Sequence, residues 1–588
     1  MKHLASALAG FIFCAPLFAQ APPPPGDRTS LPPAKQAKVG DEILGNIESL
    51  RLAENRSIAL ARVGALRCKD DPKSSRELLQ RSINELVDSL ATEPDTGQQP
   101  YEIYSPVASA RNLVLNVIAG CDAELALRSL ERTRPLSVQK ALNKTPETAG
   151  KIGSPGDQTG NIASSEFALQ QRLVLLAATQ DPDRNAKLLQ DTIKGDLTSE
   201  TLRLLTKLFE KNPEAANALA AETIERLASA SYSLPSNSSQ LLLATNILLN
   251  ATRDSKPGVA ALKFDDAAIR SLSGKVIAYL LSIDPRIAAG FVQPMIRVAE
   301  KFSPGSVVAL KKIETSRYPP GSIGIGASSD AQKLLQAPNQ SPSQLIADAG
   351  KLPQAQRAPV IQQAANKMAE LDQFSGAVEL LNANFTGAAL ENALESLRWW
   401  YAAHLMNHAL WAEAETVMDA MNTSNQRSAY TQLAAKAFQS DAVKNKDLAV
   451  RVLEKVRSTL PQRPTDQTEL SQFMQLAAAF GPISADDGFR LMDGITPPLN
   501  DLADATIIVQ AFQHAQLSRS GEFKLAFSGF GFRVDQNAFR KLAGVDLDRT
   551  LQSINSFSRR EIRIAILLGL LDNQAPGTAN GISVGIGM

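Results

Sequence analysis

Residues 368–381 read MAELDQFSGAVELL and residues 407–418 read NHALWAEAETVM. Each stretch places an alanine, Ala377 or Ala414, three residues after an aromatic residue and within an apolar run of helical spacing. A third stretch, NKDLAVRVLEKV at 445–456, places an alanine in the same relation to its helix. The three alanines lie 37 and 35 residues apart, a period typical of helix pairs stacked on one another.

These segments resemble tetratricopeptide repeats over about residues 350–460. In that family an alanine early in the second helix lets the first helix approach closely, and an aromatic stands three residues before it, as Phe374 and Trp411 do here. The sequence departs from the family at the turn, where Asp372 and Ala409 stand near the place of the usual glycine, and the terminal proline is absent. The resemblance implies helix pairs with a concave face, and a looser all-helical solenoid fits the same residues equally well.

The first half of the chain repeats the same helix–turn–helix pattern. Four helix starts place Asp or Asn directly before a proline: Asp71, Asp181, Asn212 and Asp284. Asp or Asn can cap an unpaired backbone N–H, and proline fits the first helical position. Strand-like alternation is scarce, and its best example is FKLAFSGFGFRV at 523–534. We therefore predict an all-α fold of stacked helix-hairpin repeats, an α-solenoid, arranged as an elongated stack in two blocks.

Composition divides the chain into six predicted parts. They are a signal peptide at 1–19, a Pro-rich flexible tether at 20–39, an N-terminal helical-repeat block at 40–315, a Gly/Pro/Ser linker at 316–343, a C-terminal tetratricopeptide-like block at 344–572 and a flexible tail at 573–588. The signal peptide is indicated by Lys2 followed by the apolar run from Leu4 to Phe13. It predicts export to the periplasm or the extracellular space. The longest later apolar run, IRIAILLGLL at 562–571, is half the length of a membrane span, and we expect a buried helix there.

Charge and composition narrow the function. Without Lys2, the basic residues equal the 60 acidic ones, and we find no basic block, so a nucleic-acid partner is not expected. With 44% hydrophobic and 21% charged residues the chain is typical of globular proteins. Two of the three cysteines, Cys68 and Cys121, follow the signal peptide, and an isolated pair in an oxidising compartment indicates a disulfide. Two separate buried thiols are the alternative.

The stretch RWWYAAHLMNHALW at 398–411 holds all three tryptophans and two of the four histidines. One interpretation is that it contributes a concave aromatic surface that binds a partner. The candidate residues are Trp399, Trp400, Tyr401, His404 and His408. A helix over 390–408 places Glu391, Glu395 and Arg398 on an arc that we expect to face water, with Trp400 and His404 roughly opposite. Packing between helices is the alternative role for these aromatics, and the one expected for Trp411.

A metal site is not predicted, although His404 and His408 have the spacing of two ligands on one helix turn. Zinc needs three or four protein ligands, and a metalloprotease helix needs glutamate where Leu405 stands. No cofactor motif was found: GSIGIG at 321–326 lacks the strand and helix of a dinucleotide loop.

We therefore expect a non-catalytic scaffold that binds an unknown protein or peptide. An envelope-associated enzyme with a dispersed carboxylate site, or a purely structural envelope module, is the alternative. Carboxylate pairs such as Asp265–Asp266 and Asp486–Asp487 are interpreted as helix-start residues.

Overall fold

The computed structural model describes residues 31–91, 106–143, 159–232, 238–252, 262–316, 331, 334–335, 340–513, 521–523, 525 and 535–571. Within these residues it contains 26 α-helices and no strand. The predicted all-α class is therefore confirmed, and the consecutive helices pack against one another as stacked hairpins.

The helices up to residue 316 are α1 (Pro33–Asn46), α2 (Ala53–Arg67), α3 (Pro72–Ala91), α4 (Pro106–Cys121), α5 (Ala123–Ser129), α6 (Leu136–Leu142), α8 (Thr159–Gln180), α9 (Pro182–Lys194), α10 (Thr201–Lys211), α11 (Pro213–Ser229), α12 (Ser238–Thr252), α13 (Asp266–Ser282), α14 (Pro285–Phe302) and α15 (Val307–Ser316). Two short 3₁₀ turns, η1 (Ile47–Ser49) and η2 (Pro304–Ser306), lie between them.

The later helices are α17 (Pro342–Lys351), α18 (Gln354–Glu370), α19 (Phe374–Asn384), α20 (Gly387–Asn407), α21 (Trp411–Asp419), α22 (Thr423–Ser440), α23 (Lys446–Ser458), α24 (Gln467–Ile483), α25 (Ala485–Gln513), α27 (Gln536–Val545), α28 (Leu547–Asn555) and α29 (Arg560–Leu571).

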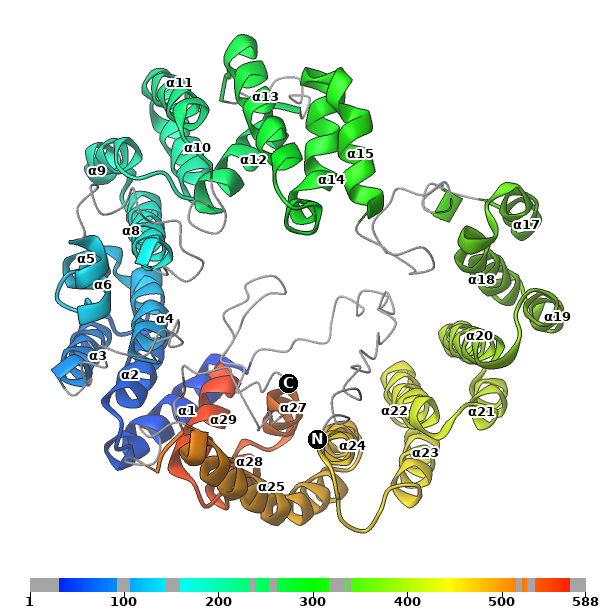
Figure 1. The fold of residues 1–588 in the computed structure, drawn as a ribbon. Helices are drawn as coiled ribbons and strands as arrows, with labels where there is room; N and C mark the ends of the chain where they lie inside the picture. The colour runs from blue at the N-terminus through cyan, green and yellow to red at the C-terminus, as the bar shows by residue number, and fades with distance from the viewer. Residues whose placement is uncertain are drawn as a thin grey trace, which may run out of the picture.

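The helix pairs follow a circular path rather than the expected elongated stack (Figure 1). One helix of each pair lies toward the centre of the circle and its partner lies on the outside. The inner helices include α4, α8, α10, α12, α18, α20, α22 and α24. The outer helices include α3, α5, α9, α11, α13, α19, α21 and α23. This arrangement gives the molecule a concave inner surface built from one helix per pair.

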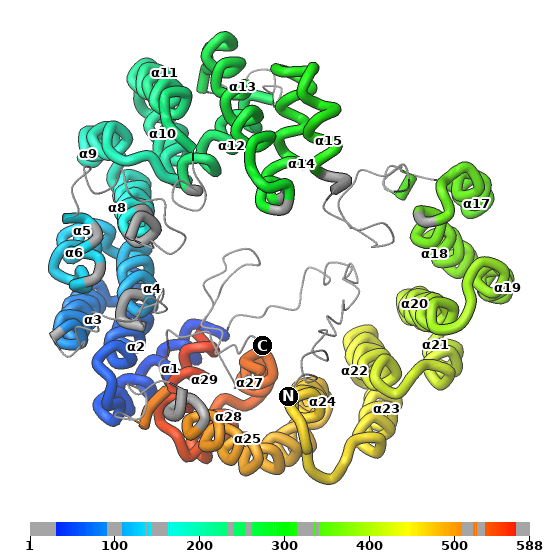
Figure 2. Tube along the Cα trace, in the orientation of Figure 1, coloured from blue at the N-terminus to red at the C-terminus, as the bar shows by residue number. Residues whose placement is uncertain are grey.

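The first and last described helices meet. The first helix, α1, packs against the last one, α29, and α2 contacts α29 as well (Figure 2). Lys35 on α1 donates from Nζ to the carbonyl oxygens of Ala543 and Gly544, each at 2.9 Å, which satisfies the free carbonyl end of α27. We call this contact between α1–α2 and α27–α29 the ring seam.

One apolar core passes through the ring seam. It includes buried residues from Leu31 to Ala177 and from Ala402 to Leu570. The predicted blocks 40–315 and 344–572 therefore share a core where their far ends meet, a contact that no local sequence pattern indicates. The expected buried helix at 562–571 is confirmed, because α29 is buried along nearly all of its length.

The hairpin turns form as their residues predict. Asp181 and Asn212 each accept a hydrogen bond from the third backbone N–H of the following helix, at 3.2 and 3.0 Å. Asp71 does the same for Ser74 at 3.1 Å. The prolines that follow these caps begin α9, α11 and α3.

Several expectations fall on residues outside the described part. They are the signal peptide at 1–19, most of the tether at 20–39, most of the linker at 316–343, nearly all of the 523–534 stretch and the tail at 573–588. The tether's end at residue 39 is wrong, because α1 begins at Pro33 and Val39 is fully buried. Proline suits a first helical turn, and the apolar face of α1 packs at the ring seam.

Candidate functional site

The aromatic residues of α20 lie on different faces of the helix. Trp399 packs against the main core. Tyr401 stacks on Phe374 of α19, with ring centroids 4.5 Å apart. Trp400 is 39% exposed. Adjacent residues on a helix lie about 100° apart, so the five predicted binding residues do not form one continuous stripe.

The two histidines lie at the turn that joins α20 to α21. The rings of His404 and His408 are 4.5 Å apart, and His404 Nε2 lies 3.4 Å from a carboxylate oxygen of Asp372. His408 is exposed, whereas His404 is half-buried beside Tyr401. Across the described residues, no group of three or more His, Cys, Asp or Glu side chains could hold a metal ion.

The acidic arc of α20 faces water only in part, because Glu391 is exposed whereas Glu395 and Arg398 are half-buried. Glu395 is half-buried, and its Oε1 accepts hydrogen bonds from the backbone N–H of Asn422 at 2.9 Å and from the Asn425 amide at 3.0 Å. Glu395 therefore binds the start of α22, while Trp400, roughly opposite it on α20, is exposed. A single helix cannot indicate which of its sides the next hairpin will cover.

Trp400 shares its side of α20 with Asn407, since seven residues complete almost two helical turns. Asn407 is exposed, and its Oδ1 accepts a hydrogen bond from Nζ of Lys436 on α22 at 2.5 Å. Burial lowers the pKa of Lys436 below the usual lysine value. Both helices are inner helices of the ring (Figure 1). An exposed indole, an amide and a partly desolvated ammonium therefore lie along two neighbouring inner helices.

A polar network joins the outer helices α21 and α23. Glu415 accepts hydrogen bonds from both terminal nitrogens of Arg451, each at 2.8 Å. Lys455 Nζ lies 2.6 Å from Asp419. Tyr430 of α22 accepts a hydrogen bond from Lys455 at 2.6 Å, and burial together with the Asp419 hydrogen bond raises the pKa of Tyr430 to about 12. These contacts hold neighbouring hairpins together, and each of these charged groups is paired with another of the network.

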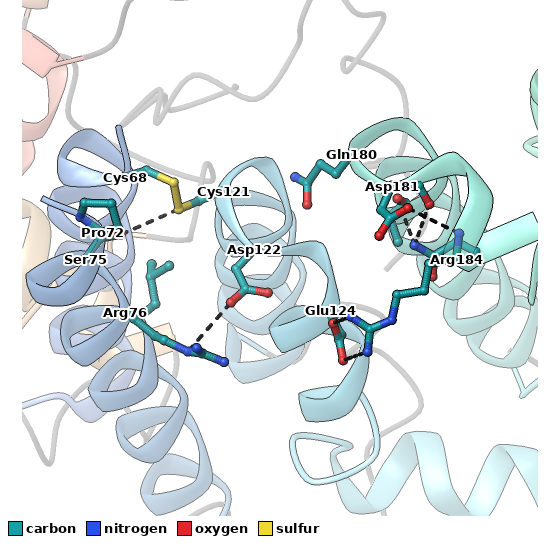
Figure 3. A pocket seen from close by; sticks show the side chains of 13 residues that line it. Cys68, Pro72, Ser75, Arg76, Cys121, Asp122, Glu124, Gln180, Asp181 and Arg184 are labelled. Carbon is teal, nitrogen blue, oxygen red and sulfur yellow. Dashed lines mark hydrogen bonds and ion pairs between the residues drawn. A yellow bond between two sulfur atoms is a disulfide. The ribbon is translucent and has the colours of Figure 1, made fainter. Parts of the chain in front are cut away.

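The structure joins Cys68 at the end of α2 to Cys121 at the end of α4 by a disulfide, with the Cα atoms 5.9 Å apart. A cleft of about 380 Å³ opens beside it, where the turns of three hairpins meet (Figure 3). The polar residues lining this disulfide cleft are Ser75, Arg76, Asp122, Glu124, Gln180, Asp181, Arg184 and Asn185.

The charges in the disulfide cleft are mostly paired. Arg184 contacts Glu124 at 2.9 Å, and Arg76 lies 4.0 Å from Asp122 (Figure 3). Ser75 donates from its hydroxyl to the Gly64 carbonyl at 2.7 Å, and no histidine lines the cleft to activate it. The cleft can offer hydrogen bonds to a polar ligand, but it holds no nucleophile with an adjacent base.

Sequence reasoning missed the disulfide cleft as a surface. Its one available signal was the capping residue Asp181, which the sequence identifies as a helix start but not as part of a cleft. Gln180 next to it bridges two hairpins: its amide donates to the Ala119 carbonyl at 2.7 Å and accepts from Ala123 N–H at 3.1 Å. Such a bridge depends on which hairpins stack on one another, and the local sequence does not indicate that.

Three of the four carboxylates in the pairs considered for catalysis have structural partners. Asp265 caps α13 by accepting from Ala268 N–H at 2.8 Å. Asp486 and Asp487 pair with Arg549 and Arg490, at 2.6 and 3.0 Å. Among the described residues, none of the helices is both long enough and apolar enough to cross a membrane.

Comparisons with known proteins give no family. No protein-family model matches the chain, and no curated protein matches it. A search of solved structures finds a circular tandem repeat protein with novel repeat topology and enhanced subunit contact surfaces, at 13% identity and a TM-score of 0.20. The match covers 92% of this chain and 96% of the other, and at that TM-score it carries no argument about function.

Proposed function

We propose that this protein is an exported, non-catalytic scaffold that binds a protein or an extended peptide on the inner surface of its ring. The observation that carries the proposal is Trp400, a large aromatic residue left 39% exposed on the inner helix α20. Exposed tryptophan is costly to solvate and is enriched among residues that dominate binding energy. Asn407 and Lys436 beside it supply polar contacts that can orient a partner.

The described residues form no reactive arrangement, and this favours a scaffold over the enzyme alternative. The described acids that were candidates for catalysis cap helices or pair with arginines, and the serine in the disulfide cleft has no base beside it. The disulfide between Cys68 and Cys121 supports export, since such bonds persist in oxidising compartments. Mass spectrometry of the exported fraction tests this: a mature chain beginning at Gln20 supports it, and retention of residues 1–19 contradicts it.

The Trp400→Ala variant tests the binding surface. Binding of envelope proteins or peptides to the purified ring, measured as a dissociation constant for each captured partner, should weaken at least tenfold, because hot-spot aromatics contribute about 2 kcal/mol or more. The melting temperature should remain close to that of the native protein. Unchanged affinity of every partner in this variant would contradict the proposal.

Two matched variants separate binding from packing. Trp399→Ala removes a side chain that packs against the core, and it should lower the melting temperature. Leu410→Ala changes an apolar residue of similar exposure, 41%, at the hairpin turn, and it should leave both partner affinity and stability nearly unchanged.

A further inference from the structure

The ring seam contains a buried acid that the packing of the helices does not explain. Glu561 lies in the first turn of α29 with 5% of its surface exposed. Glu522, in the segment 521–525, is buried to the same degree. Glu561 contacts the residue next to Glu522, and an ionised carboxylate at such a depth is costly unless it is well paired.

The segment 521–525 is held on one side by α2. Glu522 accepts the backbone N–H of Arg51 at 2.6 Å, just before α2 begins. Asn55, fully buried in α2, donates to the Glu522 carboxylate at 2.7 Å and to the Phe523 carbonyl at 2.6 Å, and it accepts from Leu525 N–H at 2.8 Å. The Asn55 side chain thus donates to a backbone carbonyl and accepts from a backbone N–H, as the main chain of an adjacent strand would.

On its other side the segment meets Glu561, and this contact is weak. Phe523 N–H donates to Glu561 Oε1 across 3.4 Å. Arg559 lies 3.5 Å from the same oxygen, but its Nε makes a shorter contact with Asp504 at 2.5 Å. The Glu561 carboxylate is therefore deeply buried while its nearest cation is shared with another acid.

We propose that Glu561 is a proton-operated latch of the ring: protonated, it holds residues 521–523 between α2 and α29, and ionised, it loosens that contact. A neutral carboxyl can remain buried and can donate as well as accept a hydrogen bond. An ionised one gains by moving toward water, and because it sits where α29 begins, that movement strains the seam itself.

The surroundings of Glu561 favour its protonated form, as the latch requires. Burial raises the pKa of Glu561, the nearby Glu522 raises it further, and the backbone N–H groups and Arg559 only partly oppose them. Other charged groups on the elements that meet at the seam include Lys35, Lys38, Asp41 and Glu42 on α1; Arg51, Glu54, Arg56, Arg62 and Arg67 at α2, with Glu85 of α3 paired to Arg56; Asp501 and Asp504 on α25; Arg540 and Lys541 on α27; Asp548 and Arg549 on α28; and Arg560 and Arg563 on α29.

The direction of the pH effect follows from the raised pKa. A carboxyl whose pKa is higher in the closed seam than in the open one stabilises closure when protonated, and it loses that contribution as the pH rises through the closed-state value. The opening constant of the seam should therefore rise by up to tenfold per pH unit from the ordinary glutamate value of 4.5 up to the raised value, and be level above it.

Hydrogen exchange on the full chain tests the latch. Opening constants are measured from pH 4 to about pH 8, corrected for the intrinsic exchange rate, for peptides that cover the start of α2 and the first turn of α29. Peptides from α13 serve as a reference remote from the seam. In the native protein the two seam regions should lose protection with rising pH relative to α13, and a level profile there would overturn the proposal.

The Glu561→Gln variant keeps the shape of a protonated carboxyl and cannot ionise. It should stay protected at every pH, while Asp548→Asn, which neutralises an exposed acid of the same seam, should keep the native pH profile. A Glu561→Gln profile that still follows the native pH dependence would assign the effect to other groups and overturn the latch.

Discussion

Two residues at the hairpin turns adopt a backbone conformation that their side chains disfavour. Asp372 and Ala409 have φ angles of 59° and 58°, and they are the non-glycine residues with positive φ in the described part of the chain. They stand where the tetratricopeptide family usually has glycine. These turns therefore hold a non-glycine residue in a conformation that favours glycine, and they retain some conformational strain.

Replacing Ala409 by glycine should stabilise the protein by about 1 kcal/mol. A Cβ in the left-handed region costs about 1–2 kcal/mol, and the greater freedom of glycine in the unfolded chain offsets part of that gain. Equilibrium denaturation in urea measures the change. Ala414→Gly, in a helix where the alanine is fully buried, is the control and should destabilise; a loss of stability in both variants would refute the strain argument.

At the scale of the helix pair, neighbouring repeats contact one another through residues about one repeat period apart. Glu415 of α21 pairs with Arg451 of α23, and Asp419 pairs with Lys455, each 36 residues further along the chain. The hydrogen bond from Arg451 lowers the pKa of Glu415, and this effect is larger than the opposing effect of burial. The predicted small residues behave as expected, since Ala377, Ala414 and Ala449 are fully buried where paired helices approach closely.

The Glu415→Gln variant should weaken the contact between α21 and α23 at neutral pH. A carboxylate with a lowered pKa contributes stability above its ordinary value and loses it as the pH falls through the folded-state value. The difference in melting temperature between native protein and variant should therefore shrink toward acid pH, and also in high salt, which screens partly exposed pairs. A difference that is constant with pH would show that packing, rather than charge, accounts for it.

At the scale of the whole molecule, closure of the ring couples residues from opposite ends of the chain. Ile43 of α1 is fully buried in the core that also contains α29. Ile43→Ala should destabilise the seam by about 2–4 kcal/mol through the cavity it leaves, and hydrogen exchange should quicken in α29 as well as in α1. Leu272→Ala, equally buried in a separate core, should leave α29 protected. Unchanged exchange in α29 after Ile43→Ala would mean that the ends are not coupled.

The disulfide restrains the same part of the ring. Reduction should add the mass of two hydrogens and lower the free energy of unfolding by about 4 kcal/mol in the chain-entropy model, because the bond closes a loop with a sequence separation of 53 residues. Mass spectrometry with and without reductant, followed by urea denaturation of both forms, measures the two effects. An unchanged mass would show that the thiols are free.

The sequence by itself determined the helices, their hairpin turns and the repeat period. These follow from residues a few positions apart: an Asp before a proline caps a helix, and a small residue such as Ala414 allows close packing at each repeat. The circular path, the ring seam and the disulfide cleft were decided only by the tertiary structure. Their contacts depend on small rotations between successive pairs, which add along the whole chain until α1 meets α29. For the same reason, the exposure of Trp400 and the contact of Glu395 with the start of α22 became evident only in the tertiary structure.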